Sequence, residues 1–207
     1  LGAIFVTLIY GILRFANFAT GDMMSFGTMF AVLLTYYFQS LGINLGIFPT
    51  ALITIPFATF MMILYMLSID KFVFEYYRIK KSPPVQLAMV SVGVMFVTQA
   101  IIRIIIGPAD RNFLDGQKFI LKATEFKEMT GLNEGLTIKS TQAITIVITM
   151  IVVSIMFWFL NKTKTGTSMR AYSDNEDLAL LSGIDPKRVV MITWIIAGIL
   201  ATIGGIL

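Results

Sequence analysis

Long apolar runs with few or no charged side chains dominate this sequence. A helix of about 20 apolar residues spans the hydrocarbon core of a lipid bilayer. Five runs have about that length, and a shorter run stands at the start of the chain. The sequence therefore predicts an all-α, polytopic transmembrane helical bundle with about six membrane segments. The expected segments are residues 1–13, 23–48, 49–69, 85–107, 141–160 and 189–207.

The composition excludes several classes of protein. With 57% apolar and 14% charged residues, the chain is unlike a soluble enzyme. It contains no cysteine and no histidine, so thiolate and imidazole metal sites, Cys or His nucleophiles and disulfides are excluded. No Gly-rich phosphate-binding motif is present, so we expect this chain to bind no cofactor and any ATP to be used by another subunit. The basic pI of about 9.3 fits cytoplasmic loops better than nucleic-acid binding.

Both ends of the sequence lie inside apolar runs. Leu1 is not a methionine, and Leu207 stops within the last run. We therefore expect residues 1–207 to be one transmembrane domain that is truncated at both ends. No cleavable signal peptide is expected, since the short apolar region and the small-residue cleavage site are missing.

Lysine and arginine are unevenly distributed between the loops. Residues 70–84 and 161–188 together contain nine of them, against five in residues 108–140. Cytoplasmic loops of membrane proteins carry the excess of Lys and Arg. We therefore expect 70–84 and 161–188 to face the cytoplasm and 108–140 to form an external loop. That external loop is either a docking surface for a partner or a solvated linker.

The last of these loops carries the start signals of a short helix. Ser173, followed three positions later by Glu176, matches a capping box. Asp174 and Asp177 add negative charge, which stabilises a helix N-terminus. We therefore expect a helix over residues 174–182.

Stop and restart signals follow in the same loop. Gly183 suits the left-handed position that ends a helix, and Asp185 with Pro186 suits the start of the next helix. Helices that lie on lipid usually carry Lys and Arg on the polar face, whereas this polar face is acidic. We therefore expect this helix to bind in a groove of a partner protein rather than to lie on the bilayer surface. The expected apolar anchors are Met169, Tyr172, Leu178 and Leu181.

Two segments carry a resemblance to a known family. They are MRAYSDNEDLALLSGIDPKRV at residues 169–189 and YGILRFANFATGDMMSFGTM at residues 10–29. The first resembles the coupling loop of ABC importer permeases. The chain as a whole is similar to the branched-chain amino acid permease family over all 207 residues.

This resemblance implies a division of labour. In the family, two permease subunits form the pathway, two cytoplasmic ATP-binding subunits hydrolyse ATP, and an external binding protein delivers the amino acid. This chain would then be a permease subunit of the bacterial inner membrane and not itself an enzyme. Tyr172 and residues 173–175 are more polar than is usual in the family. The resemblance assigns coupling to the ATPase to Ser173, Glu176, Asp177, Leu180, Gly183 and Pro186.

A polar interruption follows the first apolar run. Polar groups at membrane depth persist where they are buried in protein or line a water-filled path. One interpretation is a broken helix whose freed backbone groups bind an amino acid. The other is a short cytoplasmic turn, with an arginine as an anchor and an aspartate as a helix N-cap. The residues concerned are Arg14, Asn17, Thr20, Gly21 and Asp22.

Two further patterns predict contacts between helices. Gln86 and Gln99 lie inside the same apolar run, and both are expected to hydrogen-bond to a neighbouring helix. Ala197, Ala201 and Gly205 recur every four residues and predict a small-residue face that allows close approach. The neighbouring helix could belong to this chain or to a partner permease.

Three other functions remain open at this level. A member of the same family could import urea, short amides or other amino acids. An ion-coupled secondary transporter would need paired ionisable residues at mid-membrane, for which only Arg14, Asp22 and Arg103 are available. A membrane scaffold without transport activity is disfavoured by the capped loop helix.

Overall fold

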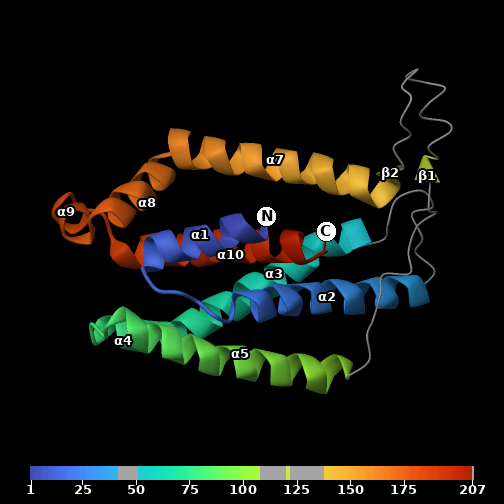
Figure 1. Cartoon of the computed structure of the whole chain (residues 1–207), viewed down its shortest axis with the longest axis horizontal. Coiled ribbons are helices and arrows are strands. Elements are labelled where there is room, and N and C mark those ends of the chain that lie inside the picture. Colours follow the sequence, from blue (N-terminus) through green and yellow to red (C-terminus); the bar gives the residue numbers. More distant parts are fainter. Residues whose placement is uncertain (42–50, 108–119, 122–137, 207) are drawn as a thin grey trace.

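Helices make up nearly all of the structure (Figure 1). The computed structural model describes residues 1–41, 51–107, 120–121 and 138–206. The all-α prediction is confirmed, with two very short paired strands as an addition. The elements are α1 (Gly2–Leu13), α2 (Thr20–Ser40), α3 (Ala51–Ile69), the π-helix η1 (Asp70–Phe74), α4 (Glu75–Ile79), α5 (Pro84–Ile106), β1 (Ile120–Leu121), β2 (Ile138–Lys139), α7 (Ser140–Lys162), α8 (Lys164–Asp174), α9 (Glu176–Leu181) and α10 (Pro186–Ile206).

Four helical stretches within the described ranges are long and apolar enough to cross a membrane. The expected membrane bundle is therefore confirmed, while the count of six is approximate. Of the other two predicted segments, α1 is an apolar helix of only 12 residues, and α2 has 21 residues but is less apolar. The four stretches are Ile53–Ile79, Pro84–Ile106, Thr145–Lys162 and Pro186–Ile206.

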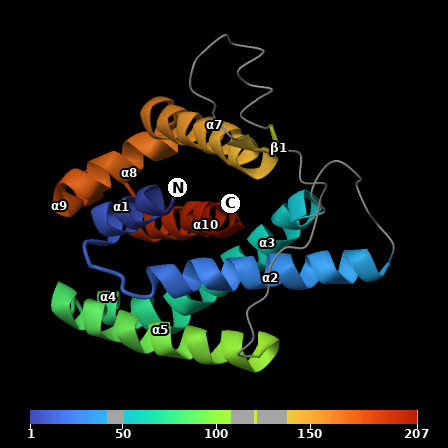
Figure 2. The ribbon, with the colours of Figure 1, turned by 45° about the vertical axis from the view of Figure 1, so that its right-hand side comes forward.

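α10 forms the centre of the bundle, where it packs against α1, α2 and α3 (Figure 2). Ala197 and Ala201 on α10 are fully buried. A Cβ at Gly205 would lie 2.9 Å from the carbonyl oxygen of Met24 on α2, so only glycine fits there without a shift. The predicted small-residue face is therefore confirmed, and the helices that it meets belong to the same chain.

The π-helix η1 continues α3 and brings an aromatic ring into the core. Phe74 is fully buried and lies between two other buried rings. Its ring centroid is 5.1 Å from that of Phe15 and 5.6 Å from that of Trp194. Both Nη atoms of Arg78 bind the Asp70 carboxylate, at 2.5 and 2.9 Å. This end of α3 is thus tied both to α10 and to the residue that follows Arg14.

α7 runs beside the bundle and packs mainly against α8 (Figure 1). Ile146, Met150, Phe157 and Trp158 expose more than half of their surface. Such an apolar exterior is expected of a helix that faces lipid or another membrane helix.

The predicted external loop 108–140 lies almost entirely outside the described residues. Only β1, β2 and the first residue of α7 fall within it, with Ile120 opposite Lys139 and Leu121 opposite Ile138. Its external position, and the cytoplasmic position of 70–84 and 161–188, remain predictions.

Candidate functional site

The polar segment between α7 and α10 folds into two short helices with an angled junction. Thr163 is the N-cap of α8, and its hydroxyl accepts a hydrogen bond from the Gly166 N–H at 3.0 Å. α8 then turns back so closely on α7 that a Cβ at Gly166 would lie 2.7 Å from the Leu160 Cα. Gly166 therefore sets the angle at which α8 leaves α7.

The predicted capping box is wrong. α9 begins at Glu176, and its N-cap is Asn175, whose side-chain oxygen accepts from the Leu178 N–H at 3.1 Å. Asn175 has extended backbone angles, φ −153° and ψ 111°, which end α8 and start α9. Ser173 lies in the last turn of α8 and cannot be the N-cap of α9, and its hydroxyl instead donates to the Gly11 carbonyl oxygen of α1 at 2.7 Å.

The predicted stop and restart are confirmed. Gly183 has φ +80°, and its N–H donates to the Leu180 carbonyl oxygen at 3.0 Å. The Ile184 N–H donates to the Ala179 carbonyl oxygen at 3.0 Å, which completes a Schellman motif. α10 then begins at Pro186, where the preceding Asp185 carboxylate caps the N-terminus.

The four predicted apolar anchors divide into two pairs. Met169 and Tyr172 of α8 are buried in the bundle, with 1% and 7% of their surface exposed. Leu178 and Leu181 of α9 instead expose 60% and 85%. Only Ala179 of α9 is buried, so this helix presents its leucines and its acidic residues outward together.

A hydrogen bond joins the two short helices. The Tyr172 hydroxyl donates to the Glu176 carboxylate at 2.9 Å. Burial, and after it this hydrogen bond, raises the pKa of the Tyr172 phenol to about 12. The phenol therefore stays protonated at physiological pH and continues to hold the first residue of α9.

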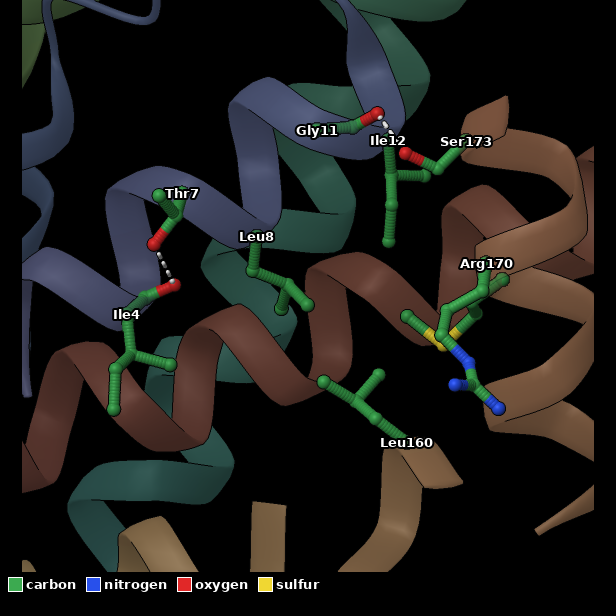
Figure 3. Close-up of a pocket in the computed structure, with 9 residues that line it drawn as sticks. Ile4, Thr7, Leu8, Gly11, Ile12, Leu160, Arg170 and Ser173 are labelled. Carbon is green, nitrogen blue, oxygen red and sulfur yellow. Dashed lines mark hydrogen bonds between the residues drawn. The ribbon is translucent and has the colours of Figure 1, made fainter. Parts of the chain in front are cut away.

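The C-terminal ends of α1 and α8 meet and cap each other. Arg14 has left-handed angles, φ 56° and ψ 28°, and ends α1. Its Nη2 donates to the carbonyl oxygens of Ser173, at 2.8 Å, and Asp174, at 3.2 Å. Figure 3 shows the reverse bond from Ser173 to Gly11, beside an open, mostly apolar pocket of about 230 Å³ between α1 and α8.

α2 begins beside the middle of α5 rather than beside its end (Figure 1). The Phe18 N–H donates to the hydroxyl of Ser91 at 3.0 Å, and Gln99 Nε2 donates to the Asp22 carboxylate at 3.1 Å. Since α5 starts at Pro84, a rise of 1.5 Å per residue places Ser91 and Gln99 about 10 and 22 Å along the helix. This geometry favours a broken helix over a short turn at the membrane surface.

The five polar residues of this interruption separate into two groups. Arg14 binds α8, whereas Asn17 lies three residues before α2 and the other three lie in its first turn. The side-chain oxygen of Asn17 accepts a hydrogen bond from the Ala19 N–H, and its backbone carbonyl oxygen accepts one from the Thr20 hydroxyl. Gly21 has no atom within 4 Å of a Cβ built on it, so it borders open space.

Sequence reasoning identified one of the two residues of α5 that hold this interruption. The predicted interhelical hydrogen bond of Gln99 is confirmed, and its partner is Asp22, whereas Gln86 is exposed in the first turn of α5. Ser91 was missed, although it is fully buried and bonds Phe18. Its only signal was a hydroxyl within an apolar run. In the described ranges no three acidic side chains come close enough to hold a metal ion.

The chain is similar in sequence to known membrane transport proteins. A family model described as branched-chain amino acid transport system, permease component, matches residues 1–207. The chain is 24% identical to the high-affinity branched-chain amino acid transport system permease protein LivH of Escherichia coli K12 and of Salmonella typhimurium LT2. Each alignment covers 99% of this chain and 64% of the relative, so the chain spans just under two thirds of their length.

One further relative is named as a permease for a different class of substrate. The nucleoside ABC transporter permease protein NupB of Lactococcus lactis is 33% identical over 95 residues, which is 46% of this chain and 26% of that protein. No solved structure matches the chain.

Proposed function

The chain belongs to the family of branched-chain amino acid transport permease components, and from this membership we propose that it lines the membrane pathway of an ABC importer. Members of this family are non-catalytic membrane subunits of ABC transporters. In the proposal, ATP is hydrolysed by separate cytoplasmic ATP-binding subunits. A second permease subunit completes the pathway in the inner membrane. An external binding protein delivers the substrate to this pathway.

The observation that carries this proposal is the exposed surface of α9. Leu178 and Leu181 have no place in the core of the chain, and Glu176 and Asp177 lie exposed beside them. A short helix that shows both apolar and acidic side chains fits a groove with an apolar floor and a basic rim. We assign that groove to the ATP-binding subunit, since the excess of Lys and Arg favours a cytoplasmic position for this loop.

The remaining coupling residues fit the same role through their geometry. The Tyr172 hydroxyl holds Glu176 at the start of α9, and Gly183 with Pro186 fixes the corner where α9 passes into α10. α10 is the central helix of the bundle. A displacement of α9 would therefore move the helix at the centre of the bundle. Ser173 in α8 and Leu180 in α9 lie in the same coupling loop.

The proposed substrate pathway passes the start of α2. In this proposal the hydrogen-bonded pair Asp22 and Gln99 lies at membrane depth, where a carboxylate and an amide would serve a substrate path. Asn17, Thr20 and Gly21 lie at the same break, and Gly21 opens onto free space. The backbone N–H groups of the first turn of α2 are suited to the carboxylate of an amino acid.

We propose branched-chain or other hydrophobic amino acids as the substrates, following the family description and the LivH relatives. A nucleoside is the second candidate, which the partial similarity to NupB favours. Both classes combine an apolar part with several hydrogen-bonding groups.

Reconstitution of the full-length protein tests the proposal. Proteoliposomes would contain it with its ATP-binding subunits and its second permease subunit, and the binding protein would be added outside. We expect uptake of labelled leucine that requires ATP. Inhibition of this uptake by unlabelled uridine would identify nucleosides as substrates. Uptake driven by an ion gradient without ATP would contradict the importer and support a secondary transporter.

A further inference from the structure

Three hydrogen bonds close a contact between α1 and α8, which we name the clasp. Its members are Gly11 and Arg14 at the end of α1 and Ser173 and Asp174 at the end of α8. Two bonds run from the Arg14 guanidinium to α8, and one runs back from the Ser173 hydroxyl to Gly11. The clasp joins positions that are about 160 residues apart in the sequence.

The clasp satisfies backbone groups that no helix can satisfy by itself. The last four carbonyl groups of any α-helix lack partners within it. Here the Arg14 guanidinium binds the C-terminal end of α8, where the helix dipole is negative. The Ser173 hydroxyl donates to the Gly11 carbonyl oxygen near the end of α1. Arg14 and Asp174 are exposed, so water would replace these partners if the contact broke, and while the three bonds hold the two helix ends stay together.

The position of the clasp makes it a junction between the two proposed sites. On one side, Asp174 is followed by Asn175, which caps α9. On the other side, Arg14 is followed by Phe15, which packs on Phe74, and by the segment that leads to Asp22. Only five residues, none of them helical, separate Arg14 from Thr20, so the end of α1 and the break are joined by a short connection.

We propose that the clasp is a rigid link that makes the end of α1 follow α8 during transport. Movement imposed on α9 then reaches the start of α2 through α8, Arg14 and the segment before Thr20. Arg14 and Ser173 act in this as positioning residues and touch no substrate. This inference rests on the proposed importer function and adds the route by which the coupling segment acts on the pathway.

The absence of cysteine from the sequence allows a direct test by cross-linking. A Cβ built at Gly11 lies 3.7 Å from the Ser173 hydroxyl oxygen, which is within reach of a disulfide. The double variant Gly11→Cys with Ser173→Cys, in the full-length importer, lacks the Ser173 hydroxyl when reduced. Oxidation replaces the lost hydrogen bond with a covalent bond. Each single cysteine variant serves as a control for oxidation elsewhere.

A rigid link predicts that oxidation raises the leucine taken up per ATP hydrolysed, by about fivefold over the reduced form. A reductant should reverse the gain, and the single variants should not respond. Lower or unchanged uptake per ATP in the oxidised form would overturn the proposal. Two cysteines that fail to cross-link would contradict the contact itself.

Arg14→Ala supplies a second, independent measurement. We expect uptake per ATP to fall about fivefold, while binding of the ATP-binding subunit and ATP hydrolysis persist. Arg14→Lys should recover part of the loss, because an ammonium can still donate to one of the two carbonyls. Unchanged coupling in Arg14→Ala would overturn the link. A wild-type protein that shows no ATP-dependent uptake would instead overturn the importer function on which it rests.

Discussion

The Arg14 guanidinium donates to the backbone carbonyl of Ser173 at 2.8 Å, across 159 residues of sequence. This bond connects the end of the first helix with the segment that resembles a coupling loop. The same Nη2 atom also reaches the carbonyl of Asp174, so a single side chain caps α8. The polar break and the polar loop, which are separate features of the sequence, are therefore neighbours in the fold.

Gly166→Ala is expected to destabilise the protein although alanine is the better helix former. The new Cβ would lie 2.7 Å from the Leu160 Cα, a backbone atom that cannot move alone. Overpacking of this kind costs about 1–3 kcal/mol. The measurement is the midpoint of thermal unfolding in detergent. Gly93→Ala on α5 is the matched control, since its Cβ meets nothing within 4 Å, and it should be neutral or stabilising. Equal midpoints for both variants would contradict the close packing of α7 on α8.

Gly183→Pro is expected to abolish transport and to leave membrane insertion intact. Proline fixes φ near −65° and has no N–H, whereas Gly183 has φ +80° and donates to Leu180. The corner between α9 and α10 would have to rearrange. Gly183→Asn is the control, because asparagine tolerates left-handed angles, and it should retain most of the uptake. Unchanged ATP-dependent uptake by the proline variant would show that this corner is not needed.

Tyr172 is expected to ionise near pH 12, because burial and the Glu176 carboxylate raise the pKa of its phenol to about 12. An unfolded tyrosine has a pKa of about 10. The folded-state value is thus the higher one, so the stabilisation from this group is complete below about pH 10 and is lost as the pH rises through about 12. The difference in phenolate absorbance between wild type and Tyr172→Phe isolates this one group. A difference that titrates near pH 10 would argue against the buried hydrogen bond.

Asp22→Asn is expected to lower leucine uptake strongly without lowering the amount of protein in the membrane. The amide oxygen can still accept from Gln99, so the contact between α2 and α5 survives while the charge is lost. Glu75→Gln removes a carboxylate on α4, outside both the proposed pathway and the coupling loop, and controls for the change of charge. Wild-type uptake by Asp22→Asn would remove this carboxylate from the pathway.

The membrane bundle and the Gly183 to Pro186 corner were predictable because they depend on local chemistry. Apolar runs of a given length favour membrane helices, and glycine and proline have strong positional preferences at helix ends. Gly183 with φ +80° and α10 starting at Pro186 follow these preferences directly.

The start of α9 and the partners of Arg14 depended on distant contacts that local patterns do not contain. Ser173 and Glu176 have capping-box spacing, yet Ser173 is still part of α8, where its hydroxyl donates to Gly11 of α1, and Asn175 is the cap of α9. The position of Asp22 could not be predicted either, because it is shown by two contacts with a distant helix, from Phe18 to Ser91 and from Gln99 to Asp22.

The most direct test of the account is binding of the full-length protein in detergent to its ATP-binding subunit. Leu178→Ser with Leu181→Ser changes two exposed side chains of α9, and Ile79→Ser changes an equally exposed apolar residue on α4. We expect the α9 variant to lose the complex, while wild type and Ile79→Ser retain it. Retention of the complex by the α9 variant, with wild type binding equally, would contradict α9 as the coupling element.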